Sequence, residues 1–187
     1  PVSEEARSPG ARVVVIDPLR TATAEDADQF VQPLPGTDAA LALAMMHVLV
    51  RDGLVDADYV ERYTSGYDAL CARLAEWTPD RAAQVTGLEV DEIEQLARDY
   101  GTTRPALIRT LIGAEHREHG AMLFRTIACL PLLTGAWRER GGGLTRSVSG
   151  WFASTVDKDQ LAALPGAPAA ERRSFNVNHL ARALTDE

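Results

Sequence analysis

Two short apolar runs, each followed by a helical sequence, constrain the fold of this chain more than any other feature. Residues 12–16 read Arg-Val-Val-Val-Ile and are followed by Asp17-Pro18, and residues 106–112 form a second run that ends at Gly113. Runs that are apolar on both faces are typical of buried parallel strands. Proline cannot donate to a strand ladder, so Pro18 marks a strand end. The alternation of strand and helix predicts an α/β fold, with a Rossmann-like parallel sheet lobe flanked by helices.

Most of the remaining sequence predicts helices. Residues 38–52 are apolar on nearly every face, which favours a helix that is covered on all sides. Thr37 is a suitable N-cap, Asp38 lies in the positive first turn, and Gly53 is a natural stop. Further helices are expected at 56–64, 67–76, 79–85, 90–101, 118–134 and 176–184, with a polar turn or short helix at 19–29 and a possible short strand at 30–33.

The predicted organisation changes at the three consecutive glycines 141–143, which are expected to form a flexible break. Residues 1–140 are expected to form the α/β lobe. Residues 141–187 are expected to be a loop-rich segment, with loop over 144–174 and a terminal helix that leads to a missing strand. Because a sheet usually needs three or more strands and only two good ones are visible, we expect this helix-rich chain to be a truncated part of a larger multidomain enzyme.

Charge and hydropathy exclude two classes of partner. The 187 residues include 19 basic and 27 acidic side chains, for a formal net charge of −8, which argues against binding to nucleic acid. The longest apolar run, 39–50, is shorter than the roughly 20 residues of a membrane span, so no direct membrane insertion is expected. No signal peptide is visible, which favours a cytoplasmic location, although the chain begins at Pro1 and not at Met.

The cysteines and histidines predict no metal site within the chain. Cys71 and Cys129 belong to no Cys-x-x-Cys pair, so neither a disulfide framework nor an iron–sulfur site is expected from them. His116 and His119 have no carboxylate at a recognised ligand spacing. His47 lies in an apolar helix and is interpreted as a buried or boundary histidine with a satisfied ring. No phosphate loop or nucleophile elbow is present, so no catalytic residue is predicted.

Candidate binding residues gather in three segments, 17–21, 36–38 and 113–120, which end strands or begin helices. Ligands of open α/β sheets bind beyond the carboxyl ends of the strands, so these segments are expected around one crevice. Asp17 has two interpretations, because it could accept hydrogen bonds from ribose hydroxyls or cap the turn before proline. Asp38 could bind two adjacent N–H donors of guanine, or could serve only as a first-turn helix residue.

Arg20 also has two interpretations from spacing alone. Its guanidinium could pair with a phosphate or stack on a base, or it could be a solvated loop side chain.

Taken together, these segments resemble the central region of the molybdopterin oxidoreductases, the relatives of dimethyl sulfoxide reductase, formate dehydrogenase and nitrate reductase. The resemblance begins at about residue 10 and covers nearly the whole chain. Its most specific parts are Val-Val-Val-Ile-Asp-Pro-Leu-Arg-Thr-Ala-Thr-Ala at 13–24 and Pro-Gly-Thr-Asp-Ala-Ala-Leu at 35–41. It continues through 27–28, 56–60, 63–67, 78–87, 113–120, 133–135, 141–143 and 176–180.

The resemblance implies a cofactor, in which molybdenum or tungsten is held by two molybdopterin guanine dinucleotides. The cofactor-binding residues that it implies are Asp17, Pro18, Arg20, Thr21, Gly36, Thr37 and Asp38 at the guanosine end, with Gly113 and His116 on the pterin and phosphate side. The sequence departs from the family pattern in two places. Leu111 stands where relatives often have a glycine, and Glu115-His116 stands where a Gln or Arg is expected.

The function implied by the resemblance is that of a cofactor-binding domain fragment of such an oxidoreductase, with formate-dehydrogenase-like members the most similar. Its partners would be the rest of the parent chain and a small-molecule redox substrate. The metal ligand and an iron–sulfur cysteine motif would lie upstream, so the fragment alone is expected to be inactive. Two alternatives remain: a non-catalytic guanine-nucleotide-binding or assembly module with the same fold, and a generic Rossmann-like nucleotide enzyme. The absence of Gly-x-Gly-x-x-Gly after either strand argues against the second alternative.

Overall fold

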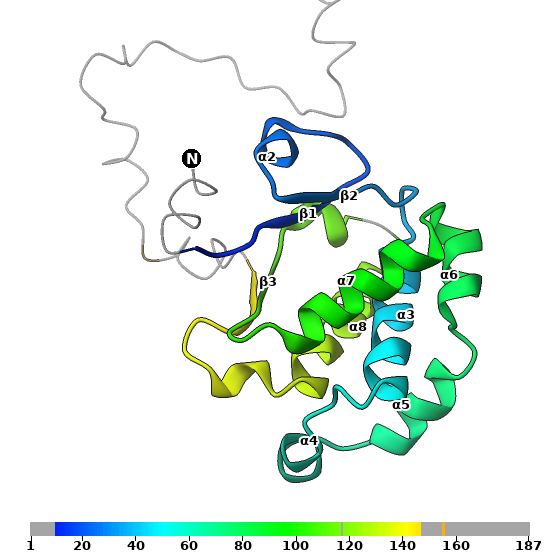
Figure 1. Ribbon diagram of the computed structural model, residues 1–187, viewed down its shortest axis with the longest axis vertical. Coiled ribbons are helices and arrows are strands. Elements are labelled where there is room, and N and C mark those ends of the chain that lie inside the picture. Colours follow the sequence, from blue (N-terminus) through cyan, green and yellow to red (C-terminus); the bar gives the residue numbers. More distant parts are fainter. Residues whose placement is uncertain (1–9, 117, 147–154, 156–187) are drawn as a thin grey trace, which may run out of the picture. The chain divides into compact units, whose positions relative to one another are not determined.

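The computed structural model describes residues 10–116, 118–146 and 155 (Figure 1). The chain divides into two compact units, residues 1–147 and 148–187, and every element described below lies in the first. The helix predicted at 176–184 and most of the loop predicted at 144–174 lie outside the described residues.

Apart from β4 and two short 3-10 turns, the described elements follow the predicted order of strands and helices. The strands are β1 (Val14–Ile16), β2 (Gln29–Val31), β3 (Leu107–Thr110) and β4 (Gly143–Arg146). The helices are α2 (Ala22–Glu25), α3 (Asp38–Arg51), α4 (Ala57–Tyr63), α5 (Tyr67–Leu74), α6 (Pro79–Thr86), α7 (Val90–Thr102) and α8 (Gly120–Leu133), with short 3-10 turns η1 (Ile112–Ala114) and η2 (Ala136–Arg138). Each helix predicted within residues 10–116 and 118–146 is confirmed.

The four described strands form two parallel pairs. β1 pairs with β2 so that Ile16 lies opposite Val31, and β3 pairs with β4 so that Thr110 lies opposite Arg146. The prediction of a helix-rich α/β fold with parallel strands is therefore confirmed. Within the described residues the strands belong to two sheets and not to one, so the Rossmann-like arrangement stays a prediction.

The start of β4 corrects one prediction about the region around the three glycines. Residues 144–146 belong to a strand, although we predicted a loop, and two of the glycines donate backbone hydrogen bonds. Gly142 N donates to Glu139 O at 3.0 Å, and Gly143 N donates to Ala106 O at 2.9 Å. The strand was missed because it begins at a glycine, which has low β-propensity, and because it is only four residues long.

Helix α3 forms the centre of the core. It packs against α5, α6, α7 and α8, and Figure 1 shows it running beside α7 and α8. Met46, Val48 and Leu49 are fully buried on it. A helix covered on nearly all sides needs the apolar residues on every face that the sequence displays. The helix ends at Arg51, and Gly53 follows with a φ of +69°, the left-handed conformation that stops helices.

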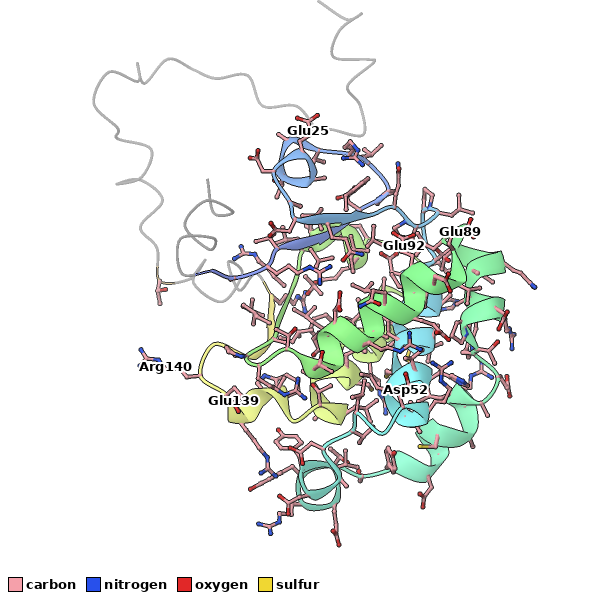
Figure 2. The ribbon with its side chains drawn as sticks, viewed as in Figure 1. Glu25, Asp52, Glu89, Glu92, Glu139 and Arg140 are labelled. Atoms are coloured by element: carbon pink, nitrogen blue, oxygen red, sulfur yellow. The ribbon has the colours of Figure 1, made fainter. Side chains whose placement is uncertain are left out.

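A ring of four charged side chains joins the end of α3 to α7. Arg51 reaches Asp52 and Glu94, each at 2.7 Å, and Arg98 reaches the same two carboxylates at 2.9 and 2.7 Å. Figure 2 labels Asp52 at this end of α3. The hydrogen bond from Arg51, with a further one from Arg98, lowers the pKa of Asp52 to about 2 against the opposing effect of desolvation.

The charged ring makes a prediction about acid stability. The folded-state pKa of Asp52 is about 2, below its ordinary value of 3.8. The contribution of the ionised Asp52 carboxylate to the stability of the folded chain is therefore fully present above pH 3.8 and is lost as the pH falls towards 2. We expect the stability difference between the native chain and Asp52→Asn, measured by urea unfolding, to shrink across this window. A difference that stays constant from neutral pH to below 3.8 would contradict the prediction.

Candidate functional site

The turn after β1 holds the first candidate segment. Asp17 N continues the strand ladder by donating to Val31 O at 3.2 Å. The Asp17 carboxylate is half-buried, and its Oδ1 accepts a hydrogen bond from Leu19 N at 2.8 Å, across the exposed Pro18. One oxygen therefore caps the turn, as one interpretation of the sequence predicted. The other oxygen has no hydrogen-bond partner among residues 10–116 and 118–146, so it can still accept from a ligand.

Gln32 joins the end of β2 to the same turn and was not singled out from the sequence. Its Nε2 donates to Pro18 O at 2.9 Å. Because Ile16 and Val31 are register partners, Asp17 and Gln32 follow at equivalent positions on two adjacent strands. The signal was available, since a polar residue directly after an apolar strand lies at the sheet edge where ligands bind.

Arg20 and Thr21 continue the first segment, and both have contacts within the protein. The Arg20 guanidinium lies 4.5 Å from the centre of the Phe30 ring, although the residue as a whole is exposed. The Thr21 hydroxyl accepts from Ala24 N at 3.4 Å and so caps the short helix α2. Stacking on an aromatic face fixes the position of a guanidinium and leaves its N–H donors available at the edge.

A tight turn before α3 holds the second candidate segment. Thr37 N donates to Leu34 O at 3.2 Å, and Gly36 has a φ of +88°. Pro35 followed by a glycine with positive φ is the sequence of a type II turn, which other residues would strain at the glycine position. Leu34 N donates to Thr86 O at 2.7 Å, which anchors the turn on the end of α6.

Thr37 occupies the N-cap position of α3, but the predicted cap is wrong. Its hydroxyl donates to Leu34 O at 2.6 Å and makes no hydrogen bond to the helix. The first-turn N–H groups of Asp38 and Ala39 have no hydrogen-bond acceptor among the described residues. The half-buried Asp38 carboxylate has no hydrogen-bond donor and no cation as a partner among those residues. The start of α3 therefore offers free N–H donors beside a free carboxylate.

The third candidate segment follows β3 in the other sheet. Gly113 and His116 are exposed, and a Cβ placed on Gly113 would meet no atom within 4 Å. The fold therefore does not need glycine at this position for space. His116 N donates to Ile112 O at 3.1 Å, but its ring has no partner among the described residues. The segment presents an open backbone at Gly113 that a ligand could approach closely.

The remaining polar groups singled out from the sequence are structural. His47 Nδ1 lies 2.9 Å from Leu74 O, which confirms a satisfied boundary histidine. Cys71 and Cys129 are free and partly buried, and burial raises the pKa of the Cys129 thiol. Within residues 10–116 and 118–146, no three His, Cys, Asp or Glu side chains converge on a common point, and no helix there has the length and apolar character needed to span a membrane.

Comparison with known proteins gives consistent matches. The family model described as molybdopterin oxidoreductase matches residues 2–183. A Bacillus subtilis protein named "Probable oxidoreductase YoaE" is 38% identical over 185 residues, which are 99% of this chain and 27% of that protein. The F420-dependent formate dehydrogenase subunit alpha of Methanocaldococcus jannaschii is 32% identical over 139 residues, or 74% of this chain and 21% of that one.

A solved structure also matches the chain. The acetylene hydratase from Pelobacter acetylenicus superposes with a TM-score of 0.68 at 32% identity, over 71% of this chain and 18% of that one. The chain thus spans about a quarter or less of the length of each of these relatives.

Proposed function

The chain belongs to the molybdopterin oxidoreductase family, and from this we propose that it is a cofactor-binding domain fragment of a molybdenum or tungsten enzyme that carries two molybdopterin guanine dinucleotides. It would hold the guanosine end of one dinucleotide. The parent enzyme would transfer electrons to or from a small-molecule substrate in the cytoplasm, and a formate-dehydrogenase-like enzyme is one form that it could take.

The start of α3 is the observation that carries this proposal. The recognition edge of guanine has two adjacent N–H donors and one carbonyl acceptor. The Asp38 carboxylate can accept from both donors, while the free N–H groups of Asp38 and Ala39 can donate to the carbonyl oxygen. Adenine has the opposite order of donor and acceptor at its edge, so the same site would favour guanine.

The residues at the edge of the first sheet, formed by β1 and β2, could bind the ribose and phosphates next to the guanine. The free Asp17 oxygen can accept from ribose hydroxyls, and the Arg20 guanidinium, which is stacked on Phe30, can donate to a phosphate. Pro18, Thr21, Gly36 and Thr37 would then shape the backbone around the nucleoside, and Gly113 and His116 would approach the pterin and phosphate side.

The cofactor and the protein would have different roles in the parent enzyme. When bound, the metal and its pterins supply the redox chemistry, and the protein supplies binding and orientation. The residues of this chain bind and orient one end of the dinucleotide. We place the metal ligand and the iron–sulfur cysteines in upstream parts of the parent chain, and we expect this chain alone to be inactive.

Exposed apolar side chains on β1 and β3, and directly after β3, support the proposal that the rest of the parent chain is the partner. Ile16, Leu107 and Leu111 are 43%, 54% and 53% exposed. Parallel strands are normally covered on both faces, so these side chains are a suitable surface for further strands and helices of the parent enzyme.

The test uses the full reading frame that contains this chain, expressed anaerobically. Molybdenum and tungsten would be measured by elemental analysis, and GMP would be measured after acid hydrolysis. About one metal ion and about two GMP per chain are expected, as two guanine dinucleotides require. Protein without metal or GMP, from a host that loads a control enzyme, would favour the alternative of a non-catalytic binding or assembly module.

Substitution of Asp38 by asparagine tests the guanine contact directly. The amide keeps one acceptor but turns a donor towards a donor of guanine, so a loss of about 1–3 kcal/mol in binding is expected. The measurement is the rate at which GMP-containing cofactor is lost from the loaded protein. Asp80→Asn is the matched control, since Asp80 is also a first-turn acid but lies on α6. Equal retention in the two variants would contradict the assignment of Asp38.

A further inference from the structure

Arg146 is the last residue of β4 and lies directly opposite Thr110, the last residue of β3. The chain leaves β3 at this point and enters η1, so Arg146 stands beside the start of the third candidate segment. Its guanidinium forms an ion pair with the Glu115 carboxylate and lies 5.3 Å from the centre of the Phe124 ring on α8. One side chain thus connects β4, the segment after η1, and α8.

Glu115 is held by its backbone as well as by its side chain. A Cβ placed on Gly120, the first residue of α8, would lie 2.1 Å from Glu115 O. The start of α8 therefore packs directly on this carbonyl group, and only glycine allows the approach. The Glu115 side chain is only 20% exposed, although Gly113 and His116 on either side of it are exposed.

Apart from the backbone hydrogen bonds of the η1 turn, the Glu115 side chain therefore makes the contact that ties this segment to β4 and α8. A Cβ placed on Gly113 would meet no atom within 4 Å. The His116 ring has no partner among the described residues. We propose that Arg146 is a positioning residue that holds residues 112–116 in place, and so sets where Gly113 and His116 meet the bound dinucleotide. The identity of the ligand in this inference rests on the proposed function.

The chemistry of arginine suits this role. Its planar guanidinium can stack on the Phe124 ring and hydrogen-bond the Glu115 carboxylate at the same time. Lysine keeps the charge but has no planar face, so it should restore the pairing only in part. Because the ion pair is partly exposed, it contributes little to global stability, and variants at residue 146 are expected to fold.

The experiment uses the full-length protein and compares Arg146→Ala and Arg146→Lys. Arg140→Ala is the matched control, since Arg140 is exposed in the nearby loop and extends away from the chain (Figure 2). Amide hydrogen exchange over residues 111–120 reports how tightly the segment is held, without any need for cofactor. Retention of GMP-containing cofactor and the absorption spectrum of the loaded protein report the contact with the dinucleotide.

In Arg146→Ala we expect faster exchange over 111–120, a several-fold faster loss of cofactor and an altered spectrum. Arg146→Lys is expected to restore these in part, and Arg140→Ala is expected to behave as wild type. Unchanged exchange would overturn the proposal, and so would faster exchange with unchanged retention and spectrum. A wild-type protein without metal or GMP would overturn the proposed function and the ligand with it, whereas the exchange measurement would still show separately whether Arg146 holds the segment.

Discussion

Replacement of Met46 by alanine is expected to lower the free energy of unfolding of the chain by about 2–5 kcal/mol. Met46 lies on α3 and is completely buried within the main apolar cluster. Truncation to alanine removes three heavy atoms from close packing, so the loss combines the transfer free energy of the side chain with the cost of the cavity left behind. The measurement is urea unfolding followed by far-ultraviolet circular dichroism.

Met122→Ala is the matched control for Met46→Ala. Met122 lies on α8 with 56% of its surface exposed. The same atoms are removed there without opening a buried cavity, so a change within about 0.5 kcal/mol is expected. Met46→Leu should cost less than about 1.5 kcal/mol, because leucine has a similar volume. A similar loss in Met46→Ala and Met122→Ala would show that α3 is not the centre of the core.

The helices could be predicted because each carries a local signal. The apolar residues on every face of α3 predicted a fully covered helix, and glycines with positive φ stand after α3 and α6, at Gly53 and Gly87. These signals act within one or two turns of chain, so they do not depend on tertiary structure.

The strand pairing could not be predicted in the same way. β3 and β4 are separated by α8 and η2, and β4 begins at Gly143, a residue with low strand propensity. Its position depends on a hydrogen bond to Ala106 O, which lies far away in the sequence. Long-range hydrogen bonds leave no periodic pattern in the sequence, so the strand was assigned to a loop.

The positions of the candidate residues in the secondary structure were predicted better than their contacts. Asp17 and Asp38 lie at a strand end and a helix start, as their neighbouring residues indicated. Thr37 has the right residue type and position for a cap, but its hydroxyl bonds to Leu34 O in the preceding turn. The contact of Arg146 with Glu115 could not be predicted, because it depends on the register of β4. Residue type thus predicted position better than it predicted partners.

Replacement of Gly143 by alanine is expected to cost about 3 kcal/mol of stability, for two reasons that add. Gly143 has a φ of +104°, a conformation that residues with a Cβ rarely adopt. The added Cβ would also lie 2.4 Å from two ring atoms of Trp137. Because β4 begins at this residue, the variant should also loosen the pairing of β3 with β4. The measurement is urea unfolding, with amide exchange over 107–110 to report the pairing.

Gly141→Ala separates the two causes. Gly141 also has a positive φ, of +89°, but a Cβ there would meet no atom within 4 Å. It should therefore show only the backbone strain, about 1 kcal/mol, and little change in exchange over 107–110. The additional loss in Gly143→Ala would then come from the contact with Trp137, and Trp137→Ala should recover part of it in the double variant. Equal losses at the two glycines would show that the indole ring moves aside at no cost, and that strain alone requires glycine at the start of β4.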